Sequence, residues 1–255
     1  MQLRTFVDLL FFKTSADLRV EVSRYYLNYF WWILEPIFTM GVFYFVFQVL
    51  LSQGTPNFVA FLLIGLTFWN WFGFSVMNAA ASLLNGRMLM LQVNIPKVFF
   101  PLGTILQDLF KQLFVIGLLL TFLLFYPTPV SVTWVALPVL MIIQGILVAA
   151  SAILSAMAVP FIPDLRLLIG TLLNLLMFAS GIFFSEEVIL PQHRWIMYLN
   201  PMAGLIKNYR QVLMYASWPD WNYLLKLFLA SSALLVLALY LLNRFDQIYP
   251  RICQE

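Results

Sequence analysis

Residues 132–159 read VTWVALPVLMIIQGILVAASAILSAMAV, without a single charged side chain. A helix needs about 20 consecutive apolar residues to cross the hydrocarbon core of a bilayer, so this stretch predicts a membrane-spanning helix. The whole chain has the same character, because 63% of its residues are apolar and only 10% are charged. Soluble domains have about 45–50% apolar and about 25% charged residues. The chain is therefore expected to be one integral membrane domain.

Five more apolar stretches of comparable length surround this one, and together they predict an all-α membrane domain with six transmembrane helices. The predicted spans cover residues 31–51, 58–83, 102–126, 132–159, 165–184 and 223–242. Residues 1–30 then form an N-terminal segment, residues 31–243 the transmembrane domain, and residues 244–255 a tail.

The N-terminal segment predicts a helix that lies in the membrane interface. Apolar residues recur at helical spacing from Leu3 to Phe11, whereas Arg4, Asp8 and Lys13 fall largely elsewhere around the helix. This is the pattern of interfacial amphipathic helices. The alternative is a short helix packed against the rest of the protein.

The region between the fifth and sixth predicted spans, 185–222, contains apolar pieces at 195–199 and 202–214 that are too short to cross a bilayer. Asn200 and Pro201 predict the start of a helix, with Asn as the cap and Pro in the first turn. Non-helical backbone at membrane depth is tolerated only against protein or water. We therefore expect re-entrant outer helices that line a cavity or close the end of a pathway. An amphipathic loop on the outer surface is the alternative.

If the chain crosses the membrane six times, its loops alternate between the two sides, and most of the basic residues outside the spans fall on the same side as the termini. Nine lie on that side, at Arg4, Lys13, Arg19, Arg24, Arg87, Lys97, Arg166, Arg244 and Arg251, against three on the other, at Arg194, Lys207 and Arg210. Cytoplasmic loops carry an excess of Lys and Arg. Both termini are therefore predicted to be cytoplasmic. The net charge of +3 is too small and scattered to indicate binding of nucleic acid.

Common catalytic motifs are missing from the sequence. None of the eleven glycines is followed by lysine, so there is no phosphate-binding loop for ATP, and no Gly-x-Ser-x-Gly motif is present. One cysteine and one histidine offer no paired metal ligands. We expect no catalytic residue, no metal and no cofactor on this chain.

Ionisable side chains within the predicted spans are few, and such residues are candidates for function. Asp108 and Lys111 lie three residues apart on one helical face, where they can pair. Glu35, just before Pro36, could reach the cytoplasmic surface or hold the N-terminal helix through Arg24. They form no relay of ionisable groups across the bilayer, so active transport would need an external motor.

Aromatic residues make up 17% of the chain and crowd the first two predicted spans. An aromatic belt at the membrane interface explains many of them. Aromatic faces also stack on the apolar faces of sugar rings, weakly enough for a polymer to slide.

Five motifs appear in a characteristic order. They are WWILEP at 31–36, LIGLTFW at 63–69, NIPKVFFP at 94–101, Asp164-Leu165-Arg166, and Leu199-Asn200-Pro201 followed by Tyr209-Arg210. In this order the chain resembles the membrane subunits of bacterial type-2 ABC exporters of polysaccharides, which handle O-antigen (lipopolysaccharide), capsule or teichoic acid. The fourth motif departs from the aromatic–Arg–Asp pattern of that family, since Ile162-Pro163 precedes Asp164; Arg166 could substitute.

The resemblance implies a homodimer in the bacterial inner membrane that exports a lipid-linked glycan, driven by two nucleotide-binding ATPase subunits that hold ATP and Mg²⁺. It implies a pathway lined mainly by the first and fifth spans, and a short inner helix near 84–94 that receives the movement of the motor. The channel-lining or gate candidates are Tyr26, Tyr29, Trp32, Tyr44, Phe178, Phe183, Trp195 and Pro201. The candidate contacts with the ATPase are Arg87, Asn94, Lys97, Asp164 and Arg166.

Three other functions remain open from the sequence. A drug or lipid exporter of the same superfamily would have a closed pocket in place of an aromatic channel. An integral membrane transferase would need an ionisable cluster, for which Glu186, Glu187 and His193 are available. A passive scaffold would show no transport stimulated by an ATPase.

Overall fold

The computed structural model describes residues 3–23, 30–50, 57–93, 95–186 and 190–252, and every regular element in these ranges is helical. The long helices are α1 (Leu3–Ser23), α2 (Trp31–Tyr44), α3 (Phe58–Ala80), α6 (Phe99–Phe125), α7 (Leu137–Ala158), α8 (Leu165–Ala179), α10 (Pro201–Leu213) and α11 (Trp221–Arg244). The short ones are α4 (Ser82–Asn85), α5 (Arg87–Gln92), α9 (Arg194–Met197) and α12 (Tyr249–Ile252). A π-helical turn, Phe45–Leu50, extends α2, and a 3-10 turn, Val132–Ala136, leads into α7.

Four of the six predicted spans form helices that are long and apolar enough to cross a membrane. These helices are Phe58–Ala80, Phe99–Phe125, Val132–Ala158 and Trp221–Arg244. The other two predicted spans differ from expectation. Helix α8 has 15 residues and ends at Ala179, earlier than predicted. Gly181, two residues later, has a φ of +67°, and a left-handed glycine is a common signal for the end of a helix. The first predicted span divides into α2 and its π-helical extension.

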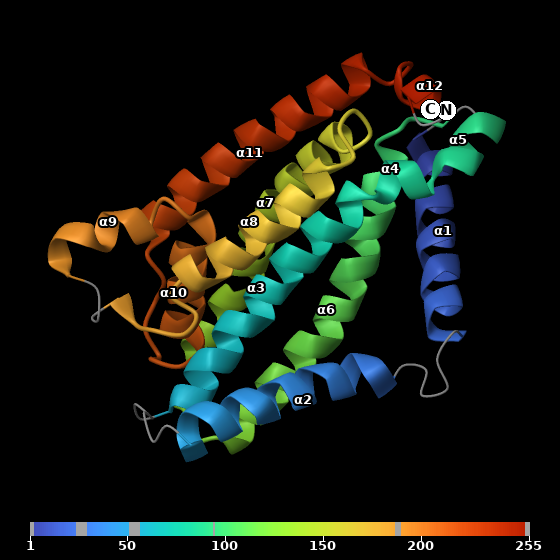
Figure 1. Cartoon of the computed structure of the whole chain (residues 1–255). Coiled ribbons are helices and arrows are strands. Elements are labelled where there is room, and N and C mark those ends of the chain that lie inside the picture. The colour runs from blue at the N-terminus through green and yellow to red at the C-terminus, as the bar shows by residue number, and fades with distance from the viewer. Residues whose placement is uncertain (1–2, 24–29, 51–56, 94, 187–189, 253–255) are drawn as a thin grey trace.

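Helix α3 is the centre of the bundle. It packs against α6, α7, α8 and α10, and most of its length is buried, while α11 runs along the outer side of α7. Figure 1 shows these long helices running side by side, with α2 lying across the far ends of α3 and α6. The start of α1, α5 and α12 lie together at the opposite end, which we call the terminal end.

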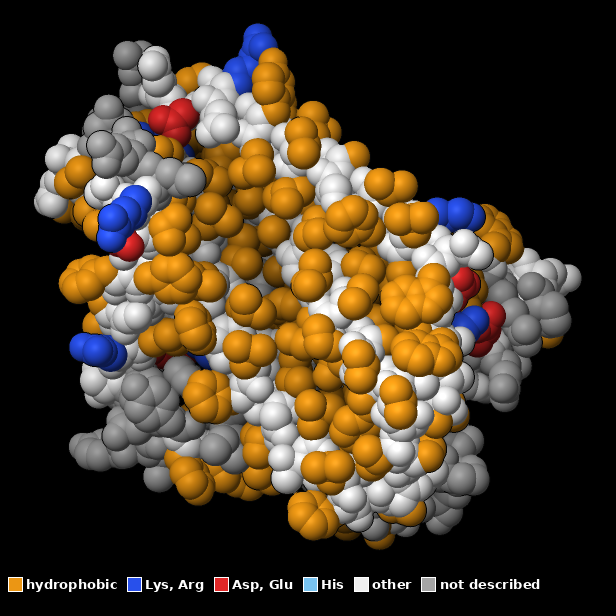
Figure 2. All heavy atoms as spheres, turned by 180° about the vertical axis from the view of Figure 1, so that it is seen from behind, with side chains coloured by type: hydrophobic (Ala, Val, Ile, Leu, Met, Phe, Trp, Pro, Cys, Tyr) orange, Lys and Arg blue, Asp and Glu red, His pale blue; other side chains and the backbone are white. Residues whose placement is uncertain are grey.

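The exposed surface suits a lipid environment. Figure 2 shows a face covered by hydrophobic side chains, with the described charges near its edges. Large apolar residues are exposed on several helices, including Phe114 on α6, Ile142 on α7 and Val236 on α11. In water this apolar surface would be unfavourable, whereas lipid tails cover it without cost.

Candidate functional site

Helix α10 begins at a well-formed cap. The side chain of Asn200 accepts a hydrogen bond from the main-chain N–H of Met202 at 3.1 Å, and Pro201 occupies the first turn. The Asn200 amide also donates to the hydroxyl of Ser180 at 2.6 Å. The predicted cap is thus confirmed, and it ties the start of α10 to the end of α8.

Arg210 fastens α10 to the rest of the bundle. Its guanidinium donates to the carbonyl oxygens of Phe61, Gly181 and Ile182, at 3.1, 2.7 and 3.0 Å. Sequence reasoning placed Arg210 among the charges of an outer region, but its side chain is only 6% exposed. Gly65 of α3 leaves the space for it, since a Cβ there would lie 2.8 Å from the guanidinium.

Tyr209, beside Arg210, makes a second connection between α10 and α3. Its ring stacks on that of Phe68 with centroids 3.4 Å apart and planes 5° from parallel, and both side chains are fully buried. The Tyr209-Arg210 pair therefore holds α10 rigidly against the middle and the start of α3.

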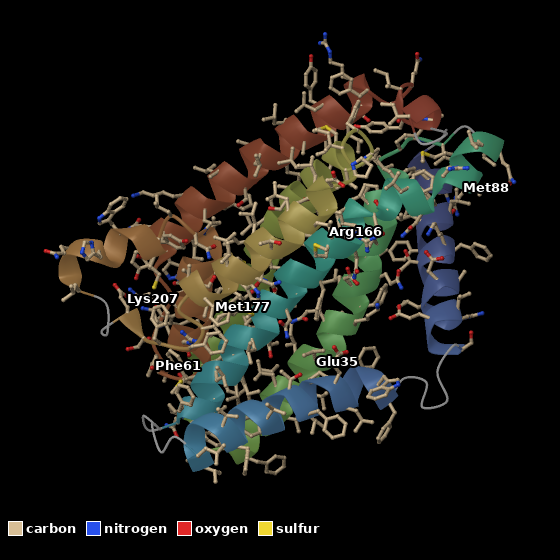
Figure 3. The ribbon with its side chains drawn as sticks, viewed as in Figure 1. Glu35, Phe61, Met88, Arg166, Met177 and Lys207 are labelled. Atoms are coloured by element: carbon tan, nitrogen blue, oxygen red, sulfur yellow. The ribbon has the colours of Figure 1, made fainter. Side chains whose placement is uncertain are left out.

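A polar cluster covers the other side of α10, where Figure 3 marks Lys207. The Lys207 ammonium lies 2.6 Å from the carboxylate of Glu186 and donates to the Tyr198 hydroxyl at 2.7 Å, and that hydroxyl donates to Glu186 at 2.6 Å. Burial alone would lower the pKa of Lys207, but its hydrogen bonds to Glu186 and Tyr198 outweigh burial and raise the pKa. Burial and the bond to Glu186 raise the pKa of Tyr198.

This cluster bears on the transferase alternative, which needed Glu186, Glu187 and His193 to act together. Glu186 is paired with Lys207, whereas the described contact of His193 is with Gln192 at 3.3 Å. Glu187 lies outside the described residues. The described part of the cluster is a structural ion pair and leaves no free carboxylate beside the histidine.

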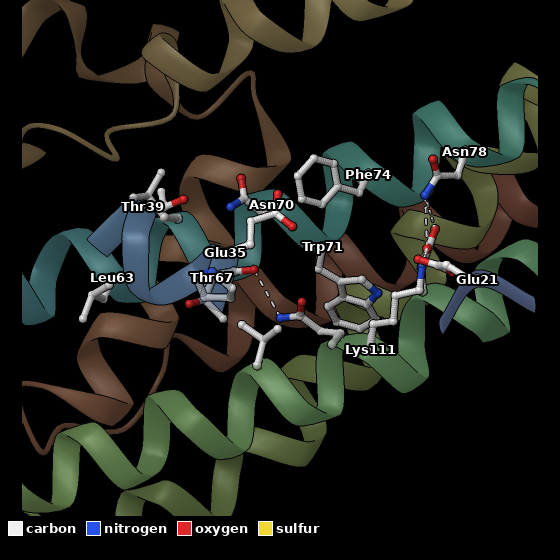
Figure 4. Close-up of a pocket in the computed structure, with 15 residues that line it drawn as sticks. Glu21, Glu35, Thr39, Leu63, Thr67, Asn70, Trp71, Phe74, Asn78 and Lys111 are labelled. Atoms are coloured by element: carbon white, nitrogen blue, oxygen red, sulfur yellow. Dashed lines mark hydrogen bonds and ion pairs between the residues drawn. The ribbon is translucent and has the colours of Figure 1, made fainter. Parts of the chain in front are cut away.

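A cavity of about 370 Å³ lies between α2, α3 and α6, beside the end of α1 (Figure 4). One wall is a network of charges. Lys111 lies 2.7 Å from Glu21 and 3.8 Å from Asp108, and the Asn78 amide donates to both Asp108 carboxylate oxygens at 3.1 Å. The predicted Asp108–Lys111 pair is confirmed, but the closer partner of Lys111 is Glu21, from α1.

The same wall explains how α1 is held. Glu21 also accepts a hydrogen bond from Gln107 of α6 at 2.6 Å. Sequence reasoning had considered Glu35 and Arg24 for this role, but Arg24 lies outside the described residues. Glu21 was missed because its partners Gln107 and Lys111 are far away in sequence.

The rest of the cavity wall combines polar and aromatic side chains. Glu35 and Thr39 come from α2, and Asn70, Trp71 and Phe74 come from α3. Sequence reasoning did not single out Asn70. The sequence could have indicated Asn70, because Asn70 and Asn78 are polar residues within an apolar span and lie two helical turns apart on one face of the helix.

The predicted lining residues that the structure describes do not surround this cavity. The predictions for Tyr26 and Tyr29, and for the side chains of Trp32 and Tyr44, lie outside the described residues. Phe178 is exposed on α8 and stacks on Phe183 at 5.4 Å, while Trp195 is exposed on α9 and Pro201 starts α10. The described candidates therefore follow the outer surface of α8 and the region of α9 and α10.

Most of the predicted ATPase contacts lie toward the terminal end. Arg87 starts α5, and Asp164 and Arg166 flank the start of α8; all three side chains are exposed. Figure 3 marks Arg166 and Met88 at this end, while Asn94 lies outside the described residues.

Lys97 belongs to the same end but is only 4% exposed. Its ammonium lies 3.6 Å from Asp246, and its main-chain N–H donates to the same carboxylate at 2.8 Å. Tyr249 of α12, which is fully buried, packs its ring 5.6 Å from that of Phe161. The segment after α11 therefore contacts both the loop before α6 and the turn before α8.

Comparison with known proteins gives one consistent result. The model of the ABC-2 type transporter family matches residues 13–214. An O-antigen export system permease protein RfbA of Klebsiella pneumoniae is 26% identical, over 96% of this chain and 95% of that protein. One of Myxococcus xanthus is 29% identical, over 92% and 91%. The inner membrane transport permease YadH of Escherichia coli K12 is 20% identical, over 74% and 78%.

Proposed function

The chain belongs to the ABC-2 type transporter family of membrane permeases, and from this premise we propose that it exports a lipid-linked polysaccharide of the O-antigen class across the bacterial inner membrane. The main support is its similarity, over nearly its whole length, to permeases of O-antigen export systems. Members of this family lack a nucleotide-binding domain of their own. Two copies of a separate ATPase subunit, with ATP and Mg²⁺, would supply the energy.

The terminal end is the proposed docking surface for the ATPase. Arg87, Asp164 and Arg166 offer charges there, and the exposed Met88 and Leu91 of α5 offer apolar contacts. Charged and apolar groups at one surface suit a partner that must bind firmly and transmit movement. With the ATPase bound at this end, both termini would lie in the cytoplasm, and Asn94 and Lys97 would belong to an inner loop.

Helix α8 is the proposed contact with a second copy of the chain. Leu173 is its only buried residue, and its large exposed apolar side chains are Leu167, Leu168, Leu172, Leu175, Leu176 and Phe178. A homodimer would cover part of this surface and enclose a pathway between α2 and α8 of the two copies. Phe178, Phe183, Tyr26, Tyr29, Trp32 and Tyr44 would then be candidates to line it, while Trp195 and Pro201 would lie near its exit.

Deleting the gene in the source bacterium tests the proposal. Surface polysaccharide should disappear while the polymer accumulates on the cytoplasmic side, and a plasmid copy of the gene should restore export. The same plasmid should fail to restore export in a strain whose own ATPase partner has been inactivated. Unchanged surface polysaccharide after deletion would contradict the proposal and favour export of a drug or lipid instead.

A further inference from the structure

The cavity between α2, α3 and α6 contains polar groups that have no partner among the residues that the structure describes. Glu35 and Asn70 both line it, and neither makes a hydrogen bond or ion pair with any residue that the structure describes. Glu35 is exposed to this space, and Asn70 is partly buried. Polar side chains among apolar helices are costly unless they find partners, so they indicate a ligand or water in the cavity.

The charged wall limits which ligand fits. Lys111 already contacts Glu21 and Asp108, so the carboxylate of Glu35 is left without a cation among the described residues. The described lining therefore carries an excess of negative charge, which repels phosphate and carboxylate groups. A purely apolar ligand would leave Glu35 and Asn70 without hydrogen bonds.

The unsatisfied groups both accept and donate hydrogen bonds. The Glu35 carboxylate accepts, whereas the Asn70 amide and the Thr39 hydroxyl do both. Hydroxyl groups are the ligand groups that match such a mixture, because each one donates and accepts. Metal binding is not indicated, since the described residues contain no group of three or more His, Cys, Asp or Glu side chains placed to hold an ion.

Aromatic rings complete the lining. Phe74 lies one helical turn after Asn70 and is 56% exposed, and Trp71 lines the cavity beside them. Rings of this kind pack against the C–H faces of a sugar while the polar groups bind its hydroxyls. The volume of about 370 Å³ falls within the range of about 300–1,000 Å³ found for small-molecule sites.

We propose that this cavity binds one uncharged sugar ring, held by hydrogen bonds to Glu35, Asn70 and Thr39 and packed against Phe74 and Trp71. The inference deepens the proposed function and rests on it, since the ring would belong to the exported glycan. Beyond the proposed function, the inference assigns a sugar-binding site to a single copy of the chain. It also predicts that this site prefers neutral to acidic sugars, because the excess negative charge repels acidic ones.

The test uses the complex of this chain with its ATPase subunits in lipid nanodiscs. The affinities for maltotetraose, a neutral probe, and for the acidic tetramer of galacturonic acid are measured by saturation-transfer NMR. The wild type should bind the neutral probe more tightly. Glu35→Leu and Asn70→Leu should each weaken its binding roughly tenfold, as expected for the loss of one hydrogen bond to the ligand.

Glu35→Gln is the discriminating variant, because it keeps the shape and one accepting oxygen but removes the charge. It should retain most of the affinity for the neutral probe and bind the acidic tetramer more tightly than the wild type does. Thr121→Val is the control, since Thr121 is exposed on α6, outside the cavity lining, and its hydroxyl donates to the carbonyl of Gly117. This variant should bind both probes as the wild type does.

The inference would be overturned if the neutral probe did not bind, or if both leucine variants bound it with unchanged affinity. Displacement of the probe by tetramethylammonium would also overturn it, because that result would identify a cation site. The gene deletion separates this failure from that of the proposed function. If the strain needs the gene for surface polysaccharide but the cavity binds no sugar, only the inference fails. If the cavity binds sugar but deletion leaves the polysaccharide unchanged, only the export proposal fails.

Discussion

The guanidinium carbon of Arg210 lies 3.3 Å from the centre of the Phe61 ring, and Nε of the same side chain donates to the Phe61 carbonyl at 3.1 Å. Two interactions of different kinds thus join residues 149 positions apart. A buried cation is costly unless it is hydrogen-bonded, and here carbonyl dipoles and an aromatic face provide that stabilisation. Arg210 is therefore expected to be essential for the position of α10.

Replacing Arg210 by Met should destabilise the protein by about 3 kcal/mol, because the carbonyl groups of Phe61, Gly181 and Ile182 lose their donor. Arg210→Lys should recover only part of this loss, since an ammonium cannot reproduce the planar fork or the stacking on Phe61. Thermal unfolding in detergent measures the effect. Arg244→Met, at an exposed position, should change stability by no more than about 0.5 kcal/mol. Equal stability of the Arg210 and Arg244 variants would contradict the assigned role.

Gly204 allows Tyr223 of α11 to approach α10. A Cβ at position 204 would lie 2.2 Å from the hydroxyl oxygen of Tyr223, which donates to the carbonyl of Pro201 at 3.0 Å. Gly204→Ala should therefore cost about 1–3 kcal/mol, through displacement of the ring. Thermal unfolding is again the measurement.

A matched glycine separates this clash from the general effect of adding a methyl group to a helix. Gly117 of α6 has nothing within 4 Å of the position of an added Cβ. Gly117→Ala should be neutral, or stabilising by up to about 1 kcal/mol. If Gly204→Ala behaved in the same way, the close approach of Tyr223 would be wrong.

The cluster of Lys207, Tyr198 and Glu186 predicts a loss of stability in alkali. The pKa of Lys207 is raised above 10.5 and that of Tyr198 above 10.0. Both groups therefore hold their protons more tightly in the folded chain than in the unfolded chain. Their stabilising effect is complete below pH 10.0 and is lost as the pH rises through the raised pKa values.

Lys207→Met should flatten this decline, which is followed by thermal unfolding as the pH is raised from neutral to above 10.5. Lys226→Met, at an exposed position of α11, is the comparison and should leave the decline as in the wild type. A decline of the same steepness in the Lys207 variant would show that this cluster does not cause it.

The proposed contact between two α8 helices can be tested by cross-linking. In a chain with Cys253→Ser, cysteine introduced at Leu168, Leu172 or Leu175, which share one face of α8, should form a disulfide-linked dimer in the membrane at one or more positions. Non-reducing electrophoresis detects it. Leu225→Cys on α11 is a matched control, since Leu225 is 58% exposed and Leu175 is 62% exposed. Dimers from Leu225→Cys and none from the α8 variants would place the interface elsewhere.

Most of the helices, and some of the residues at which they end, could be predicted from short stretches of the sequence. The spans beginning near Phe58, Phe99, Val132 and Trp221 could be predicted because hydropathy sums over neighbouring residues. The cap at Asn200 also depends only on adjacent residues. The length of α8 was overestimated, since its apolar residues continue beyond Gly181, where the backbone turns.

The tertiary structure alone decided which polar groups meet. Arg210 takes its partners from 28, 29 and 149 positions away, and Glu21 meets Lys111 across 90 positions. Helix formation follows from local spacing, but the burial of a side chain depends on which helix faces it, and that depends on the packing of the whole bundle. For this reason the amino-acid pattern is enough to predict a membrane protein with the motifs of an exporter. The hydrogen bonds of Arg210 and the polar cavity lined by Glu35 and Asn70 become visible only in the packed bundle.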